Sequence, residues 1–98
     1  MKISKNEIIL QINILKEGDQ YVSHSPALDL SSCGKTAAEA IHNIQRAVNL
    51  FLEELQEMGT LDEVLHDLGW RRSDTAGRGW IPPHLLNKEL KISFPKTL

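Results

Sequence analysis

The sequence feature that most constrains the fold is an amphipathic stretch over residues 36–58, which carries both a start and a stop signal for a helix. Thr36 and Glu39 form a capping box, in which the threonine hydroxyl accepts the Glu39 amide and the carboxylate reaches back. Gly59 favours the left-handed conformation that ends many helices. At about 100° per residue, the apolar side chains of this stretch share one arc. They are Ala37, Ile41, Ile44, Val48, Phe51, Leu52 and Leu55. Such a stripe is stable only when another element covers it, so the rest of the chain must supply one.

Three β-rich segments precede this helix and predict the sheet that covers it. Residues 8–15 are nearly continuous in apolar side chains, which is typical of an inner strand. A hairpin turn follows over residues 16–19, where Gly18 permits a positive φ. The return strand is expected over residues 20–25, and a third strand over 28–33. We expect Gly34, which comes next, to allow the backbone reversal into the helix.

The chain after the long helix predicts a short helix, a loop and one more strand. Thr60 and Glu63 have the spacing of a second capping box, which opens a helix ending near residue 68. Residues 71–87 form a basic loop with glycines and prolines. The final strand is expected over residues 88–95. Its apolar side chains alternate with polar ones and are Leu90, Ile92 and Phe94.

These elements predict an α+β fold with the order β-β-β-α-(α)-β. A right-handed crossover would return the last strand parallel to the first, which gives a four-stranded mixed sheet in the spatial order 3-2-1-4 with the long helix on one face. The 98 residues suffice for one domain over 1–98, with its core over 6–70. Trp70 and Trp80 flank the basic loop and are expected to cap the core edge, with a contact surface as the alternative.

The net charge of −2 conceals an asymmetry along the chain. Residues 1–69 hold eleven Asp/Glu and five Lys/Arg, for a charge of −6, whereas residues 70–98 carry +4. An acidic body favours a basic partner, although solvated surface is the alternative interpretation. No apolar run approaches the ~20 residues that span a membrane, and no signal-length segment opens the chain. Cys33 is the single cysteine, which excludes an internal disulfide; we expect it to be partly buried and the protein to be cytoplasmic.

No pattern of residues predicts catalysis, a metal site or a cofactor. The Glu39–His42 spacing, repeated at Glu63 and His66, occurs in di-iron bundles, but the first pair is predicted to face solvent. A two-metal nuclease needs clustered carboxylates, and residues 8–15 contain none. His24 lies between two serines without an acid spaced to orient it. We therefore expect a protein that is not an enzyme.

One segment, residues 21–40, resembles the signature of the HicB-type antitoxin family. The matching residues are Tyr21-Val22, Pro26-Ala27-Leu28, Gly34-Lys35-Thr36 and Glu39-Ala40. Leu30 and Ser31 stand where the family often has a second glycine, which indicates a tighter or differently twisted turn. The resemblance covers residues 6–70. It implies a partial RNase-H-like fold and an antitoxin of a type II toxin-antitoxin pair, which neutralises a HicA-type mRNA-cleaving toxin. It also implies a homodimer or higher homo-oligomer.

Two groups of residues are candidates for contact with partners. The candidates for binding the toxin come from two places. Leu50, Glu53 and Glu57 lie on the predicted polar face of the helix, and Glu17 and Asp19 lie in the acidic hairpin turn. The candidates for weak, salt-sensitive contact with nucleic acid are Arg71, Arg72 and Arg78. Many family members append a DNA-binding domain after this core, and from the roughly 28 residues after Trp70 we expect weak DNA binding at most. The alternative function is a stand-alone structural or oligomerisation domain without a toxin partner.

Overall fold

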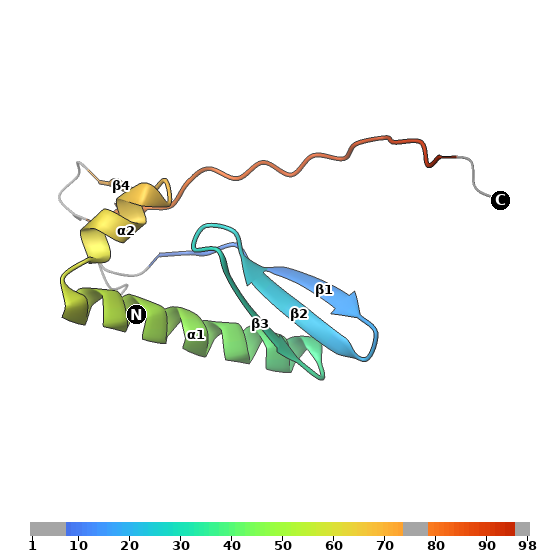
Figure 1. The fold of residues 1–98 in the computed structure, drawn as a ribbon, viewed down its shortest axis with the longest axis horizontal. Helices are drawn as coiled ribbons and strands as arrows, with labels where there is room; N and C mark the ends of the chain where they lie inside the picture. Colours follow the sequence, from blue (N-terminus) through green and yellow to red (C-terminus); the bar gives the residue numbers. More distant parts are fainter. Residues whose placement is uncertain (1–7, 74–78, 96–98) are drawn as a thin grey trace, which may run out of the picture.

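The computed structural model describes residues 8–73 and 79–95 and has the α+β architecture that the sequence predicts. Three antiparallel strands lie side by side in the order β1 (Asn13–Glu17), β2 (Gln20–Ser25) and β3 (Leu30–Gly34). The long helix α1 (Ala37–Met58) crosses one face of this sheet, as Figure 1 shows. The hairpin turn between β1 and β2 contains Gly18 at φ 59°, as predicted.

Both ends of α1 follow from the local signals in the sequence. The Thr36 hydroxyl accepts a hydrogen bond from the Glu39 amide at 3.0 Å. The Glu39 carboxylate accepts from the Lys35 amide at 2.7 Å, one residue earlier than a capping box would place it. Gly59 ends the helix in the left-handed conformation at φ 73°, and its N–H is donated to the Gln56 carbonyl.

The N-terminal half of α1 lies unusually close to the sheet because small residues line the crossing. Ser23 on β2 is fully buried, and its hydroxyl donates to the Ala40 carbonyl at 2.8 Å. A Cβ atom on Gly34 would lie only 2.7 Å from the Ala40 backbone nitrogen. The chain reverses between β3 and α1 directly after Gly34, as predicted, although Gly34 itself does not have a positive φ. The glycine is needed for space, since a side chain would push the helix off the sheet.

Burial along α1 agrees with most of the predicted apolar stripe. The helix residues that are fully buried are Ala40, Ile44, Val48 and Leu55. Phe51 and Leu52 are half-buried against the core. Ile41 differs from the prediction, because 47% of its surface is exposed. Within the described residues the sheet on which α1 packs has only the three strands β1, β2 and β3.

After α1 the chain folds back as α2 (Leu61–Asp67), followed by a separate small hairpin of β4 (Arg71–Arg72) and β5 (Trp80–Ile81). Trp70 is 2% exposed, and its indole N–H donates to the Ala27 carbonyl at 2.8 Å. This bond ties the chain after α2 to the turn between β2 and β3. Trp70 therefore caps the core edge, as predicted.

The predicted first and third strands begin too early in the sequence. β1 starts at Asn13 rather than at residue 8. Ile8, Leu10 and Ile12 are still half-buried against the core, which accounts for the apolar pattern without a strand. β3 starts at Leu30 because Asp29 has φ 55°, a left-handed conformation that strands do not accommodate.

The expected fourth strand is not formed in the described chain, so the 3-2-1-4 sheet is incomplete. β1 pairs only with β2, and residues 82–95 have no regular secondary structure. These residues run past the sheet as an extended segment (Figure 1). The cause lies just upstream, since the β4–β5 hairpin holds the chain beside α2. Pro82 and Pro83 then follow, and neither has an N–H to donate to a strand.

The second capping box, predicted from Thr60 and Glu63, is also wrong. Thr60 makes no side-chain cap to α2. Instead its amide and its hydroxyl both donate to the Leu55 carbonyl, at 2.9 Å and 3.5 Å. Thr60 still stands at the N-cap of α2, where its carbonyl accepts from the Val64 amide at 2.9 Å, but its hydroxyl is turned to the end of α1.

Candidate protein-binding surface

The outward side of α1 presents the large apolar side chain of Leu50 among polar and charged ones, and Met58, the last residue of the helix, is exposed as well. Leu50 is 57% exposed. It lies in a shallow depression of about 520 Å³, whose rim includes Arg46, Asn49 and Glu53. Residues three and four positions away on a helix are neighbours, so Glu54 also flanks Leu50. Exposed leucine beside carboxylates is a surface to which a basic protein with an apolar contact would be complementary.

The second helix extends this surface with further carboxylates. Asp62 on α2 lines the same pocket as Glu53 on α1, a hollow of about 750 Å³ between α1, α2 and the β4–β5 hairpin. Glu63 and Asp67 are exposed on α2. We call this part of the molecule the acidic end. It comprises Glu53, Glu54 and Glu57 of α1 and Asp62, Glu63 and Asp67 of α2.

The sequence identifies Glu53 and Glu57 but misses the other acids of this end. Glu54 comes four residues after Leu50, so helical spacing alone predicts that the two side chains are neighbours. The acids of α2 are different, because the sequence shows their charge but not that α2 folds back beside α1. Only the turn at Gly59 and Thr60 brings the two helices to one end of the molecule.

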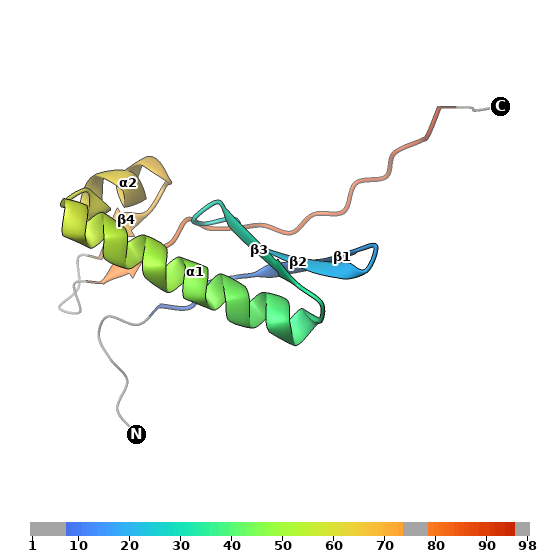
Figure 2. The same ribbon diagram turned by 60° about the horizontal axis from the view of Figure 1, so that its bottom comes forward.

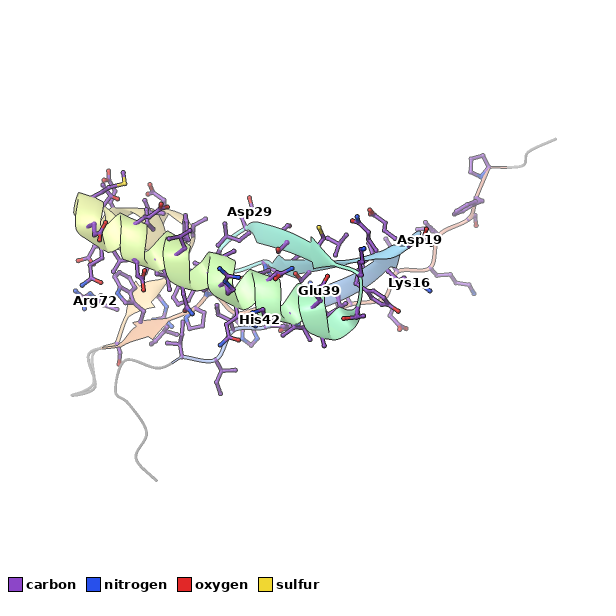
Figure 3. All side chains as sticks on the ribbon, turned by 90° about the horizontal axis from the view of Figure 1, so that it is seen from below. Lys16, Asp19, Asp29, Glu39, His42 and Arg72 are labelled. Atoms are coloured by element: carbon purple, nitrogen blue, oxygen red, sulfur yellow. The ribbon has the colours of Figure 1, made fainter. Side chains whose placement is uncertain are left out.

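Two of the predicted toxin contacts, Glu17 and Asp19, lie elsewhere. Both are exposed at the tip of the β1–β2 hairpin. Figure 3 shows Asp19 near Lys16 at the end of the molecule where α1 begins, and Arg72 at the opposite end. The five predicted residues therefore do not form one surface. Leu50, Glu53 and Glu57 lie together on α1, and the hairpin acids are separate from them.

The arginines of the basic loop are placed among carboxylates. Arg72 forms an ion pair with Asp62 at 3.4 Å and stacks over the Trp80 ring, 4.9 Å from its centroid. Arg71 and Arg72 line a hollow together with Asp62, Glu63 and Asp67. Arg78 lies outside the described residues. Carboxylates this close offset the attraction of the two guanidinium groups for phosphate, which argues for weak nucleic-acid binding at most.

The residues around His24 have more structure than the sequence predicts. Its Nε2 atom lies 3.4 Å from a carboxylate oxygen of Asp29, so an acid does contact this histidine. Ser23 and Ser25 are buried on the opposite face of β2, however, and Ser23 donates to a helix carbonyl. The three residue types are therefore not arranged as a nucleophile, base and acid.

Other expectations about chemistry concern metals, the cysteine and membranes. Within residues 8–73 and 79–95, no three His, Cys, Asp or Glu side chains are grouped closely enough to hold a metal ion. Glu39 is engaged at the start of α1 and does not pair with His42. Cys33 is exposed, so the expectation that it is partly buried is wrong. No helix in the described part of the chain combines the length and the apolar character needed to cross a bilayer.

The chain matches no family model, and no curated protein and no solved structure is significantly similar to it.

Proposed function

We propose that this protein is an antitoxin of the HicB type, which acts by binding and neutralising a small basic HicA-type toxin that cleaves mRNA. The observation that carries the proposal is the acidic end, with the exposed Leu50 beside it. The motif over residues 21–40 supports it, since this segment forms β2, β3 and the capped start of α1 as one packed unit. The partial RNase-H-like sheet and a cytoplasmic location belong to the same proposal.

The proposed mechanism is occupation of the surface with which the toxin holds RNA. Lysine and arginine side chains that bind phosphate would instead pair with carboxylates of the acidic end, which excludes the RNA. Charge attraction at this range mainly speeds encounter, and salt screens it over about 8 Å at physiological ionic strength. Leu50 would act differently, because an apolar side chain buried in the complex slows dissociation.

The test compares two double charge reversals of equal size at opposite ends of the molecule. Glu53→Lys with Glu57→Lys alters the acidic end, and Glu17→Lys with Asp19→Lys alters the hairpin tip. All four side chains are exposed, so both variants should fold. Each is expressed in cells carrying the neighbouring reading frame for a short basic protein, and its affinity for that purified protein is measured.

We expect the acidic-end variant to lose the rescue of growth and to bind at least about tenfold more weakly, which corresponds to 1.4 kcal/mol. The hairpin variant should bind within about threefold of the wild type. Equal losses in both variants would show that overall charge, rather than this surface, governs binding. A wild-type protein that neither binds nor rescues would refute the antitoxin function itself.

The second candidate function is a stand-alone oligomerisation domain without a toxin partner. One observation favours it, namely that in the part of the chain that the structure describes the outer edge of β1 is unpaired while an apolar segment extends from the body. The two functions separate in a pull-down with the neighbouring gene product. A stable homo-oligomer that captures no such product supports the oligomerisation domain.

A further inference from the structure

The C-terminal arm, residues 84–95, is an extended segment whose apolar side chains contact little of their own chain. Leu90, Ile92 and Phe94 are 83%, 66% and 85% exposed. They alternate with Lys91 and Ser93, which is the pattern of a strand with one apolar face. Figures 1 and 2 both show the arm continuing beyond the end of the β1–β2 hairpin. Apolar side chains in such a row usually mark a binding element.

A matching acceptor is present at the edge of the sheet. Within residues 8–73 and 79–95, β1 pairs with β2 along one side only, and all five of its residues are exposed. Its free side carries backbone N–H and C=O groups that a further strand would satisfy. In the register with β2, Ile14 lies opposite Ser23, on the face that α1 covers. Leu15 and Glu17 lie on the other face.

An apolar groove lies beneath α1, beside the segment that leads into β1. It has a volume of about 1000 Å³ and is lined by one side of α1, by residues 80–82, and by Ile8, Ile9, Leu10 and Ile12. Ile41 lines it, which explains how a residue of the apolar stripe remains 47% exposed. Trp80, Ile81 and Pro82 border the groove. A fourth strand beside β1 would lie next to it and bring apolar side chains toward Ile41.

The arm of the same chain is directed away from this acceptor. The β4–β5 hairpin and the two prolines hold its start, and Pro83 packs near Gly69, 3.5 Å from where a Cβ atom would be. The distal part of the arm then lies past the end of the sheet (Figure 2). In the described chain the outer edge of β1 therefore lacks a partner strand, and the arm lacks an edge with which to pair. When two copies of the chain meet, the arm of each is complementary to the β1 edge of the other.

We propose that two copies of this chain exchange arms, with residues 90–94 of each pairing with β1 of the other. Each sheet would gain its fourth strand and reach the order 3-2-1-4. Leu90, Ile92 and Phe94 would face α1 of the second copy beside Ile14. Lys91 would lie on the opposite face, the same face as Glu17, where the charges are complementary. The inference goes beyond the toxin-binding function and does not depend on it.

Disulfide trapping between two differently sized chains tests the exchange directly. Both chains carry Cys33→Ser, which removes the exposed native thiol. One carries Ile14→Cys and the other, enlarged by a tag, carries one of Leu90→Cys, Ile92→Cys or Phe94→Cys. Strand neighbours bring Cα atoms to about 4.5–5.5 Å, which a disulfide spans. We expect one of the three mixtures to form a linked heterodimer on mild oxidation. In the control, Met58→Cys at the far end of α1 replaces Ile14→Cys, and no linked heterodimer should form above background.

A single chain that carries both Ile14→Cys and the arm cysteine that formed the heterodimer distinguishes arm exchange from an arm that folds onto its own sheet. Exchange produces covalent dimers, whereas an arm folding onto its own sheet produces an internally bridged monomer, and that result would overturn the proposal. So would the absence of any linked heterodimer in all three mixtures.

The mass in solution provides an independent measurement without cysteines. Light scattering of the full chain at tens of micromolar should give twice the monomer mass of 11.0 kDa. Ile92→Asp should shift the protein to monomer, because it places a charge on the face that packs. Lys91→Asp, on the outward face, should weaken the dimer by a smaller factor. Both side chains are exposed in the single chain, so neither change should affect its folding. A monomeric wild type, or an Ile92→Asp variant that stays dimeric, contradicts the inference.

Discussion

Replacing Trp70 with phenylalanine tests whether the indole ties the chain after α2 to the turn between β2 and β3. Trp70 is 2% exposed, and its N–H donates to the Ala27 carbonyl at 2.8 Å. Phenylalanine cannot donate, so the carbonyl of Ala27, a residue that is itself 3% exposed, loses its partner at a cost of about 1–3 kcal/mol. The smaller ring leaves a void that adds roughly 1 kcal/mol. We therefore expect a loss of about 2–4 kcal/mol, against a total stability of roughly 5–15 kcal/mol for a domain of this size.

The assay is equilibrium unfolding in urea, followed by far-UV circular dichroism at one fixed protein concentration, since any self-association links stability to concentration. The matched control is Trp80→Phe. The Trp80 ring is half-buried beneath Arg72, so this change should cost less than about 1 kcal/mol. If the two variants lose the same stability, or if Trp70→Phe loses less than about 0.5 kcal/mol, the hydrogen bond to Ala27 does not hold this part of the fold together.

Three further changes test how the helix is begun and packed. Thr36→Ala should cost about 1 kcal/mol in urea unfolding, because it removes the hydroxyl that caps α1, whereas Thr60→Ala should stay within about 0.5 kcal/mol. Gly34→Ala should lower the thermal midpoint by roughly 5–20 °C, since the added methyl group meets the Ala40 backbone nitrogen at 2.7 Å; an unchanged midpoint would show that the helix moves aside freely. Ile44→Ala should cost about 2–5 kcal/mol because Ile44 is 1% exposed, and a loss below about 1 kcal/mol would place the core elsewhere.

Several elements were predictable because their signals are local. The bounds of α1 follow from Thr36, Glu39 and Gly59, which act within four residues of themselves. The hairpin turn at Gly18 and the strand after it follow from turn chemistry in the same way. In the candidate site, the exposure of Leu50 was predictable from the helical period alone.

Other predictions failed where a residue had two local roles and a neighbour determined which one applied. Thr60 does occupy the N-cap position of α2, but its hydroxyl donates to the Leu55 carbonyl at the end of α1 instead of capping α2. Asp29 lies in an alternating pattern typical of a strand, but its backbone is left-handed, so β3 begins one residue later, at Leu30. Asp19 of the hairpin and Glu53 of α1 share a charge, and the sequence could not show that Glu53 lines a pocket with Arg72, which lies at the opposite end of the molecule from Asp19.

The sequence by itself determined the two helices and the β1–β2 hairpin, since capping, turns and periodicity depend on residues a few positions apart, but it did not predict the β4–β5 hairpin within the expected loop over residues 71–87. The tertiary structure alone decided where those elements meet. The close approach of Ser23 to Ala40 and the bond from Trp70 to Ala27 join residues 17 and 43 positions apart. It also decided that the alternating residues of the arm do not pair with β1 of the same chain. A strand needs a partner edge within reach, and the path of the chain through α2 and the β4–β5 hairpin takes the arm away from the open edge of β1.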